Sequence, residues 1–247
     1  MKKNAISVCL TLAFITLIVL ISVPMPAYAV EEFRVSSNGA GVQIWFEAEA
    51  FDARDPGKGY SLTKAEAKLA VPQDTFGGEC ISPRTNDNSW VLYNFDIKQA
   101  DGKRGIWYFW GRILSPNNQS DWIWVIGDPS DSKEIPNARP AKLADPALNF
   151  ETNRIFEGTV GPPWGWFGGN VEGHDKTLQD GENTMMIFYR QSDTTDFWDV
   201  FMWSSDPQYT PTDDDYTNAK PMKGVKLAVL PLDKLSTTWG MIKELNF

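Results

Sequence analysis

Short segments rich in aromatic and β-branched residues recur along the chain, and each is bounded by Gly, Pro, Asn or Asp. Several alternate apolar and polar positions, which is the pattern of a strand with one buried face. The segment 106–110 is apolar throughout, as expected for a strand that is covered on both sides or carries a ligand face. The predicted strands are residues 43–50, 89–96, 105–114, 121–126, 183–190 and 197–205. This pattern predicts an all-β protein, and a β-sandwich fits it better than a single open sheet.

The first 29 residues have a different pattern. Two early lysines precede an apolar run over residues 6–23, and two prolines then lead into Ala27-Tyr28-Ala29. This order is typical of a secretory signal peptide that is cleaved after Ala29. Because the apolar run approaches the length of a membrane-spanning helix, retention of the leader as an anchor is the alternative. We therefore expect a secreted or otherwise extracytoplasmic protein, located in the periplasm or at the cell surface.

The predicted domain of residues 30–206 is followed by a segment rich in Pro, Thr and Asp. We interpret residues 207–247 as a linker and C-terminal extension, with the acidic run 213–215 exposed to solvent rather than bound to a metal. Residues 225–230 have the composition of one more strand. The apolar stripe of a short final helix is formed by Leu232, Leu235, Trp239 and Ile242. We expect this stripe to pack on its own domain, with a protein partner as the alternative.

Charge and composition narrow the possible functions. The chain has a net charge of −9, and loss of Lys2 and Lys3 with the leader makes it two units more negative. An acidic surface repels phosphate backbones, so a nucleic-acid partner is not expected. Loss of Cys9 leaves Cys80 alone, which excludes a disulfide framework. The 11 Trp, 14 Phe and 7 Tyr are enough for a large core and also suit a sugar-binding surface, because an indole face stacks on the apolar face of a sugar ring.

Three acidic residues suggest a metal site. Glu47 and Glu49 lie two positions apart in the first predicted strand, so their side chains share a face and repel each other unless a cation lies between them. Asp199 is the single acid of an otherwise apolar strand and would be costly to bury without a partner. Ca²⁺ takes several oxygen ligands in irregular geometry. We therefore predict a structural Ca²⁺ held by Glu47, Glu49 and Asp199.

Five motifs occur in order across residues 43–205: WFEAEAF, FGGECISPRTNDNSWVLYNFDI, DGKRGIWYFWGRIL, LQDGENTMMIFYR and FWDVFMWSS. Their order and spacing resemble carbohydrate-binding modules of families 6 and 35. The resemblance implies a jelly-roll β-sandwich with loop insertions, and a structural Ca²⁺ whose ligands match the same three acids together with backbone carbonyls. Trp107 and Arg112 match the aromatic and arginine positions of the third motif, and we expect structural roles for both.

The resemblance also implies a sugar site in loops at one end of the sandwich. The segment 161–170 is rich in Gly and Pro and is predicted to be such a loop. We predict that Trp164 and Trp166 form its aromatic platform, with Asn170 bound to sugar hydroxyls. The family's second aromatic, after the Gly-Gly turn, is absent from this chain. The polar residues found there instead are Arg84, Asn86 and Asp87. An arginine at this place suits the carboxylate of an acidic sugar.

No catalytic motif is evident. Glycoside hydrolysis needs two carboxylates across a cleft, and no motif supplies such a pair once three acids are assigned to a metal. His174 is the only histidine, no G-x-S-x-G elbow is present, and zinc chemistry usually requires more His or Cys ligands. We therefore expect a non-catalytic protein that binds a polysaccharide or glycan. The alternative is an exported structural or adhesive protein that uses the same fold for protein contacts.

Overall fold

The computed structural model describes residues 32–54, 60–62, 71–83, 90–125, 153–170, 173–189 and 196–223. The strands in these ranges are β1 (Glu32–Ser36), β2 (Gln43–Glu47), β3 (Ala53–Arg54), β4 (Tyr60–Leu62), β5 (Ile81–Pro83), β6 (Trp90–Asp96), β7 (Gly105–Val125), β8 (Arg154–Gly168), β9 (Asp175–Leu178), β10 (Glu182–Tyr189), β11 (Phe197–Ser204) and β12 (Lys220–Lys223). The helical elements are the short 3₁₀ turns η1 (Phe76–Gly78) and η2 (Ile97–Ala100) and one α-helix, α2 (Asp213–Asn218).

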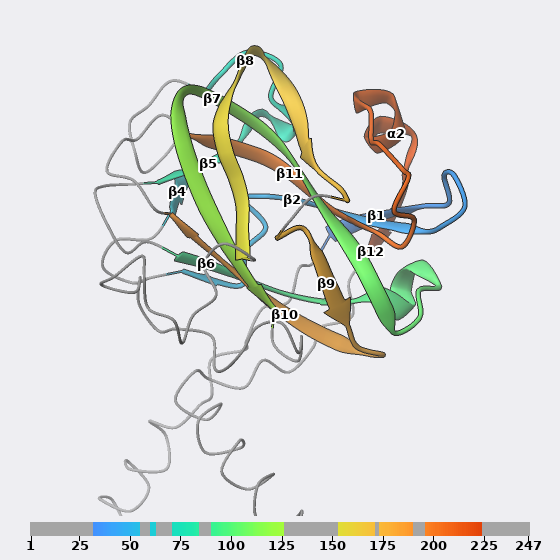
Figure 1. Ribbon diagram of the computed structural model, residues 1–247. Helices are drawn as coiled ribbons and strands as arrows, with labels where there is room; N and C mark the ends of the chain where they lie inside the picture. Colours follow the sequence, from blue (N-terminus) through green and yellow to red (C-terminus); the bar gives the residue numbers. More distant parts are fainter. Residues whose placement is uncertain are drawn as a thin grey trace, which may run out of the picture. The chain divides into compact units, whose positions relative to one another are not determined.

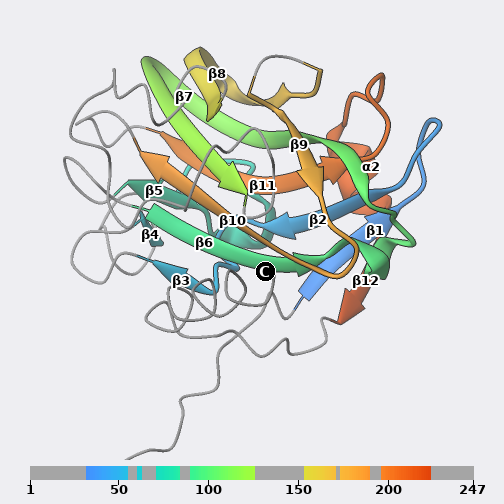
Figure 2. The same cartoon turned by 60° about the horizontal axis from the view of Figure 1, so that its bottom comes forward.

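The strands form two layers that share β7 (Figures 1 and 2). One layer has the order β12–β1–β2–β11–β7, and the other continues from β7 through β10 and β6 to β3. β7 belongs to both layers because residues 108–114 pair with β11, whereas residues 121–125 pair with β10. All pairings are antiparallel among the described strands. The predicted all-β sandwich is therefore confirmed.

The main core lies between the two layers and is largely aromatic. The Tyr93 ring of β6 lies 5.4 Å from the Phe46 ring of β2 and 5.4 Å from the Phe201 ring of β11, measured between ring centroids. β6 is not hydrogen-bonded to either strand, so these contacts cross from one layer to the other. The buried Tyr93 hydroxyl donates to the carbonyl of Ala48 at 2.6 Å, which satisfies its polar end.

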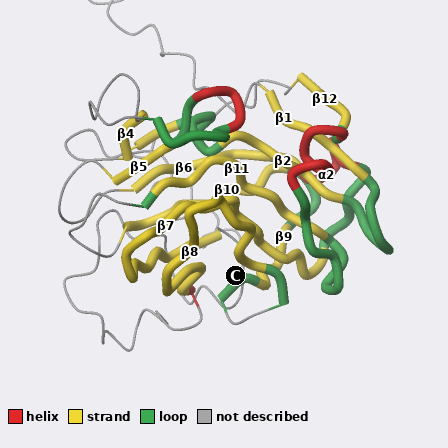
Figure 3. Tube along the Cα trace, turned by 90° about the horizontal axis from the view of Figure 1, so that it is seen from above, coloured by secondary structure: helices red, strands yellow, loops and turns green. Residues whose placement is uncertain are grey.

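The opposite face of the first layer carries a second apolar cluster. Trp45 of β2 and Met202 of β11 are directly paired across the strands and are fully buried. Residues beyond β11 cover them: the Tyr216 ring of α2 lies 6.0 Å from the Trp45 ring, and Tyr209 contacts Trp45 edge-on at 6.3 Å. Figure 3 shows α2 beside β1 and β2. Trp110 of β7 packs against this second cluster, whereas Ile106 of the same strand is exposed.

Three local predictions differ from the structure. The first predicted strand ends at Glu47, and Glu49 lies in a turn closed by a hydrogen bond from the Ala50 amide to the Glu47 carbonyl. Most of the predicted loop 161–170 belongs to β8, because the long strand β7 supplies a partner for its backbone groups. The prolines at 162 and 163 fall at a register shift of this pairing, where a missing N–H is tolerated.

The third difference concerns residues 207–223, interpreted above as the start of a linker. They fold back on the first layer as α2 and β12, and β12 pairs with β1. The physical reason is the exposed apolar face of β2 and β11, which α2 covers. Residues 1–29, the strand expected at 225–230 and the stripe from Leu232 to Ile242 lie outside the described residues. Among the described ranges, no helix is long and apolar enough to cross a membrane.

Candidate functional site

The two predicted platform tryptophans lie together on β8. Trp164 and Trp166 are two positions apart, so they project from the same face of the strand. Both are partly buried, and each indole N–H donates to the protein. Trp164 Nε1 donates to the carbonyl of Gln73 at 2.8 Å, and Trp166 Nε1 donates to Asp213 Oδ1 at 2.8 Å. Trp166 also contacts the edge of Trp45 at a centroid distance of 5.6 Å. Both rings are therefore held in fixed orientations.

Arg112 of β7 is the centre of this arrangement. Its guanidinium lies 4.3 Å from the centroid of the Phe76 ring and 5.1 Å from that of the Trp164 ring, so both aromatic rings stack on it. Arg112 Nε and Nη2 donate to the two oxygens of Asp213 at 3.0 and 2.8 Å. This bidentate pair has the geometry that fits a guanidinium to a carboxylate. The Trp164 and Trp166 side chains are thus connected through one ion pair.

The Nη1 atom of Arg112 points into the protein. It donates to Asp199 Oδ2 at 2.5 Å and to the Asp74 carbonyl at 2.9 Å. Asp199 is fully buried, and burial raises the pKa of its carboxyl to about 7, although the Phe76 amide and Arg112 oppose this rise. Burial also acts to raise the pKa of Asp213, but the bonds from Arg112 and Trp166 outweigh it, and the pKa of Asp213 is lowered. Arg112 therefore stabilises two carboxylates of different exposure.

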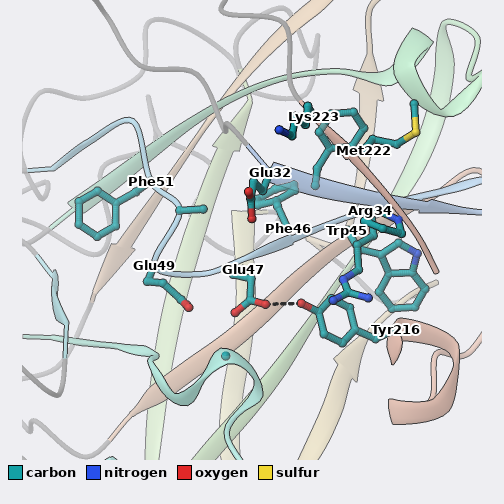
Figure 4. A pocket seen from close by; sticks show the side chains of 14 residues that line it. Glu32, Arg34, Trp45, Phe46, Glu47, Glu49, Phe51, Tyr216, Met222 and Lys223 are labelled. Carbon is teal, nitrogen blue, oxygen red and sulfur yellow. Dashed lines mark hydrogen bonds between the residues drawn. The ribbon is translucent and has the colours of Figure 1, made fainter. Parts of the chain in front are cut away.

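The carboxylates of Glu47, Glu49 and Asp199 lie close enough to interact, and the charge of Glu47 repels the other two. One oxygen of each lies buried without a hydrogen-bond partner among the described residues: Glu47 Oε2, Glu49 Oε2 and Asp199 Oδ1. Burial, followed by a hydrogen bond and repulsion from Glu47, raises the pKa of Glu49 to about 10. The Tyr216 hydroxyl donates to Glu47, as Figure 4 shows. These orphaned oxygens are the hard oxygen donors that Ca²⁺ prefers.

η1 approaches this group closely through Gly77. Gly77 has a φ of 63°, and a Cβ placed there would lie 2.8 Å from Glu47 Oε2. A glycine is therefore required for both its backbone conformation and its proximity to the carboxylate. In the part of the chain that the structure describes, no three His, Cys, Asp or Glu side chains already stand in metal-binding positions. The donor chemistry of the three acids fits Ca²⁺.

A cavity of about 760 Å³ opens beside the two glutamates. Figure 4 shows Glu47 and Glu49 at its centre, Phe51 on one side and Arg34 above the ring of Tyr216. Arg34 lies 4.8 Å from the centroid of that ring. Its lining also includes Lys223, so the cavity has carboxylates, two cationic side chains and aromatic walls.

Of the other residues predicted from the sequence, Asn170, Arg84, Asn86, Asp87 and Trp107, only Asn170 and Trp107 belong to the described ranges, and no described contact joins either to the two indoles. Asn170 is exposed just beyond the end of β8. Arg84, Asn86 and Asp87 lie outside the described residues. Trp107 is buried in the core and donates from Nε1 to the Lys103 carbonyl at 3.1 Å.

Sequence reasoning missed Asp213 as a site residue. Asp213 and Asp214 are exposed, as the sequence predicts for this acidic run, but the run forms the first turn of α2 and not part of a linker. A signal was present in Thr212 and Asp215, three residues apart, which form a reciprocal capping box in the structure. That pattern marks a helix start at residue 213.

No protein-family model matches the sequence, and no curated protein matches it. Among solved structures, the chain is similar to a family 35 carbohydrate-binding module from Clostridium thermocellum, with 13% identity over 65% of this chain and 96% of that one, at a TM-score of 0.43. It is similar to a carbohydrate-binding module of the Cellvibrio mixtus lichenase 5A in complex with cellotriose, with 14% identity over 66% of this chain and 96% of that one, at a TM-score of 0.39. The GH26-CBM35 β-(1,4)-mannanase of Podospora anserina is 9% identical at a TM-score of 0.43, with 68% of this chain and 28% of the mannanase covered. These similarities fall in the two families that the sequence motifs resemble.

Proposed function

We propose that this chain is an exported, non-catalytic carbohydrate-binding protein that binds a poly- or oligosaccharide at Trp164 and Trp166. The observation that carries the proposal is the fixed pair of partly exposed indoles on one face of β8. An indole that is already oriented loses little conformational freedom when a sugar ring stacks on it. The order of the five sequence motifs supports the same function.

The geometry favours a one-sided platform rather than a clamp. The inner face of Trp164 is stacked on Arg112, so a sugar stacks on the opposite face. Both indole N–H groups are used by the protein, so the binding energy at these rings comes from burial of the apolar sugar face. Asn170, exposed beyond the end of β8, supplies a group for hydroxyls.

The acids near the platform support a non-catalytic role. Asp199 and Asp213 are both ion-paired to Arg112. A general acid of a glycosidase needs a carboxyl group free to donate its proton to the leaving group. Neither carboxylate is in that position, so binding without hydrolysis is the function that this arrangement supports.

Replacement of Trp164 by Ala is expected to abolish retention of the protein on insoluble polysaccharide. The reason is the loss of a stacking surface that other side chains cannot replace. Retention is measured by pull-down on insoluble cellulose, xylan, mannan and galactan, followed by isothermal titration with the matching oligosaccharide. Ile106→Ala is the control, because Ile106 is 56% exposed and lies on a different strand, β7, where it pairs with Thr177 of β9. Native-like retention of the Trp164→Ala protein would contradict the assignment of the site.

Calcium is proposed at Glu47, Glu49 and Asp199 as a structural ion. It would neutralise carboxylates that otherwise repel each other in a buried position. We expect a chelator to lower the melting temperature by several degrees and added Ca²⁺ to restore it, since an ion that binds only the folded state stabilises it. Glu49→Gln is expected to remove most of this response. A melting temperature that is equal with chelator and with Ca²⁺ would rule out the ion.

A further inference from the structure

α2 lies beyond the motif-bearing residues 43–205 and is anchored firmly on the first layer. Thr212 and Asp215 cap its first turn reciprocally, and the Tyr216 ring packs on Trp45 at a centroid distance of 6.0 Å. Tyr216 also donates to Glu47 and lies 4.7 Å from the Phe76 ring. The helix is short, but these contacts fix the position of its first residue, Asp213.

Asp213 contacts Trp166 directly and is connected to Trp164 through Arg112. Its Oδ1 accepts from Trp166 Nε1 at 2.8 Å and from Arg112 Nε at 3.0 Å, and its Oδ2 accepts from Arg112 Nη2 at 2.8 Å. The Trp164 ring in turn stacks on Arg112, with its centroid 5.1 Å from the central carbon of the guanidinium. The Asp213 side chain is 53% exposed, so this connection lies at the surface beside the two indoles.

We propose that Asp213 is a positioning residue of the sugar site: through Arg112 and Trp166 it sets the relative orientation of the two indoles and thereby selects which sugar rings fit them. This inference rests on the proposed function of Trp164 and Trp166. Without the carboxylate, Trp166 loses its hydrogen-bond acceptor and the Arg112 guanidinium loses the bidentate partner that keeps it flat under Trp164. The two indoles would then sample several orientations. Binding of a sugar would have to order them, which lowers the affinity.

The neighbouring residue provides a matched control. Asp214 lies in the same turn of α2 with the same charge, so Asp214→Asn changes net charge and the charge at the helix start as Asp213→Asn does. Asp213→Glu keeps the charge but lengthens the side chain. The comparison of these three variants separates the specific contact from general electrostatics and from helix stability.

The first measurement is affinity for the oligosaccharide of whichever polysaccharide, among cellulose, xylan, mannan and galactan, retains the native protein best. We expect Asp213→Asn to weaken binding roughly tenfold, Asp213→Glu to recover part of it, and Asp214→Asn to bind as the native protein does. The second measurement is made without sugar. The indole N–H resonance of Trp166, assigned by its loss in Trp166→Phe, is expected to move in Asp213→Asn and to stay in place in Asp214→Asn.

The outcomes separate this inference from the function on which it rests. If Trp164→Ala abolishes binding while Asp213→Asn binds normally, the positioning role is overturned and the sugar site stands. An unchanged Trp166 resonance together with weaker binding would also overturn it, because it would mean that Asp213 contacts the sugar directly. If none of the polysaccharides or their oligosaccharides binds the native protein, the proposed function fails, and this inference fails with it.

Discussion

Replacement of Arg112 by Met is expected to lower the free energy of unfolding by about 3 to 5 kcal/mol, the usual cost of breaking a buried ion pair from one side. Arg112 is 3% exposed and Asp199 is fully buried. The substitution removes the Arg112 guanidinium from the Asp199 carboxylate and leaves the Asp74 carbonyl without its donor. Two aromatic rings, of Phe76 and Trp164, also lose the cation between them. Met keeps most of the side-chain volume, so the expected loss is electrostatic rather than a cavity effect.

Urea unfolding followed by tryptophan emission measures this change. Arg104→Met is the control, because the Arg104 side chain is exposed and the hydrogen bond of its backbone amide to Asp180, at 2.8 Å, is kept in the variant. We expect the control to change stability by less than about 0.5 kcal/mol. In an Asp199→Asn background the Arg112→Met change should cost clearly less, since no buried charge is then stranded. Equal costs in both backgrounds would show that Asp199 is not the group that Arg112 stabilises.

The sequence pattern located β2, β6, β7, β10 and β11 because each is a run of aromatic and β-branched residues bounded by turn residues. The residues predicted at 89–96, 183–190 and 197–205 correspond to β6, β10 and β11 within one residue at each end. The two strands predicted at 105–114 and 121–126 are one continuous strand, β7. The Pro and Asn residues between them indicated a turn, but the pairing with β8 absorbs them as irregularities between Ser115 and Gln119. The Pro and Asn residues therefore mark a bulge within β7 and not a turn between two strands.

The sequence grouped Glu47, Glu49 and Asp199, and in the structure the charge of Glu47 acts on both Glu49 and Asp199. Val200 pairs with Glu47 across β11 and β2, and the register shift between Trp198 and Val200 in the pairing of β11 with β7 falls at Asp199. The presence of a bound ion remains a prediction. The Arg112–Asp213 pair was not predictable in the same way, because its partners are 101 residues apart and α2 has only six residues, too few for an amphipathic pattern. Its position depends on tertiary contacts with Trp45.

Acidification from pH 7.5 to 4.5 is expected to destabilise the protein through His174. This side chain is 2% exposed, and burial, aided by the charge of Lys176, lowers its pKa from 6.5 to about 4, although the Phe109 carbonyl near Nδ1 opposes this. Phe109 and Phe167 pack against the ring. In the unfolded chain the imidazole takes up a proton near pH 6.5, whereas the folded protein resists it until about pH 4. Stability from the neutral ring is therefore complete above pH 6.5 and is lost as the pH falls toward 4.

The expected size of this loss is roughly 2 to 3 kcal/mol between pH 7.5 and 4.5, at 1.36 kcal/mol for each unit of pKa difference. Carboxylates titrate in the same range, so the native protein is compared with His174→Gln, which shares them but cannot take up the proton. The stability difference between the two proteins should shift by this amount in favour of the variant at pH 4.5. If Gln is not accommodated, His174→Asn serves the same purpose, and the imidazole resonances of the native protein give the pKa directly. A His174 pKa at or above 6.5 in the folded protein would contradict the prediction, since the ring would then gain stability from its proton.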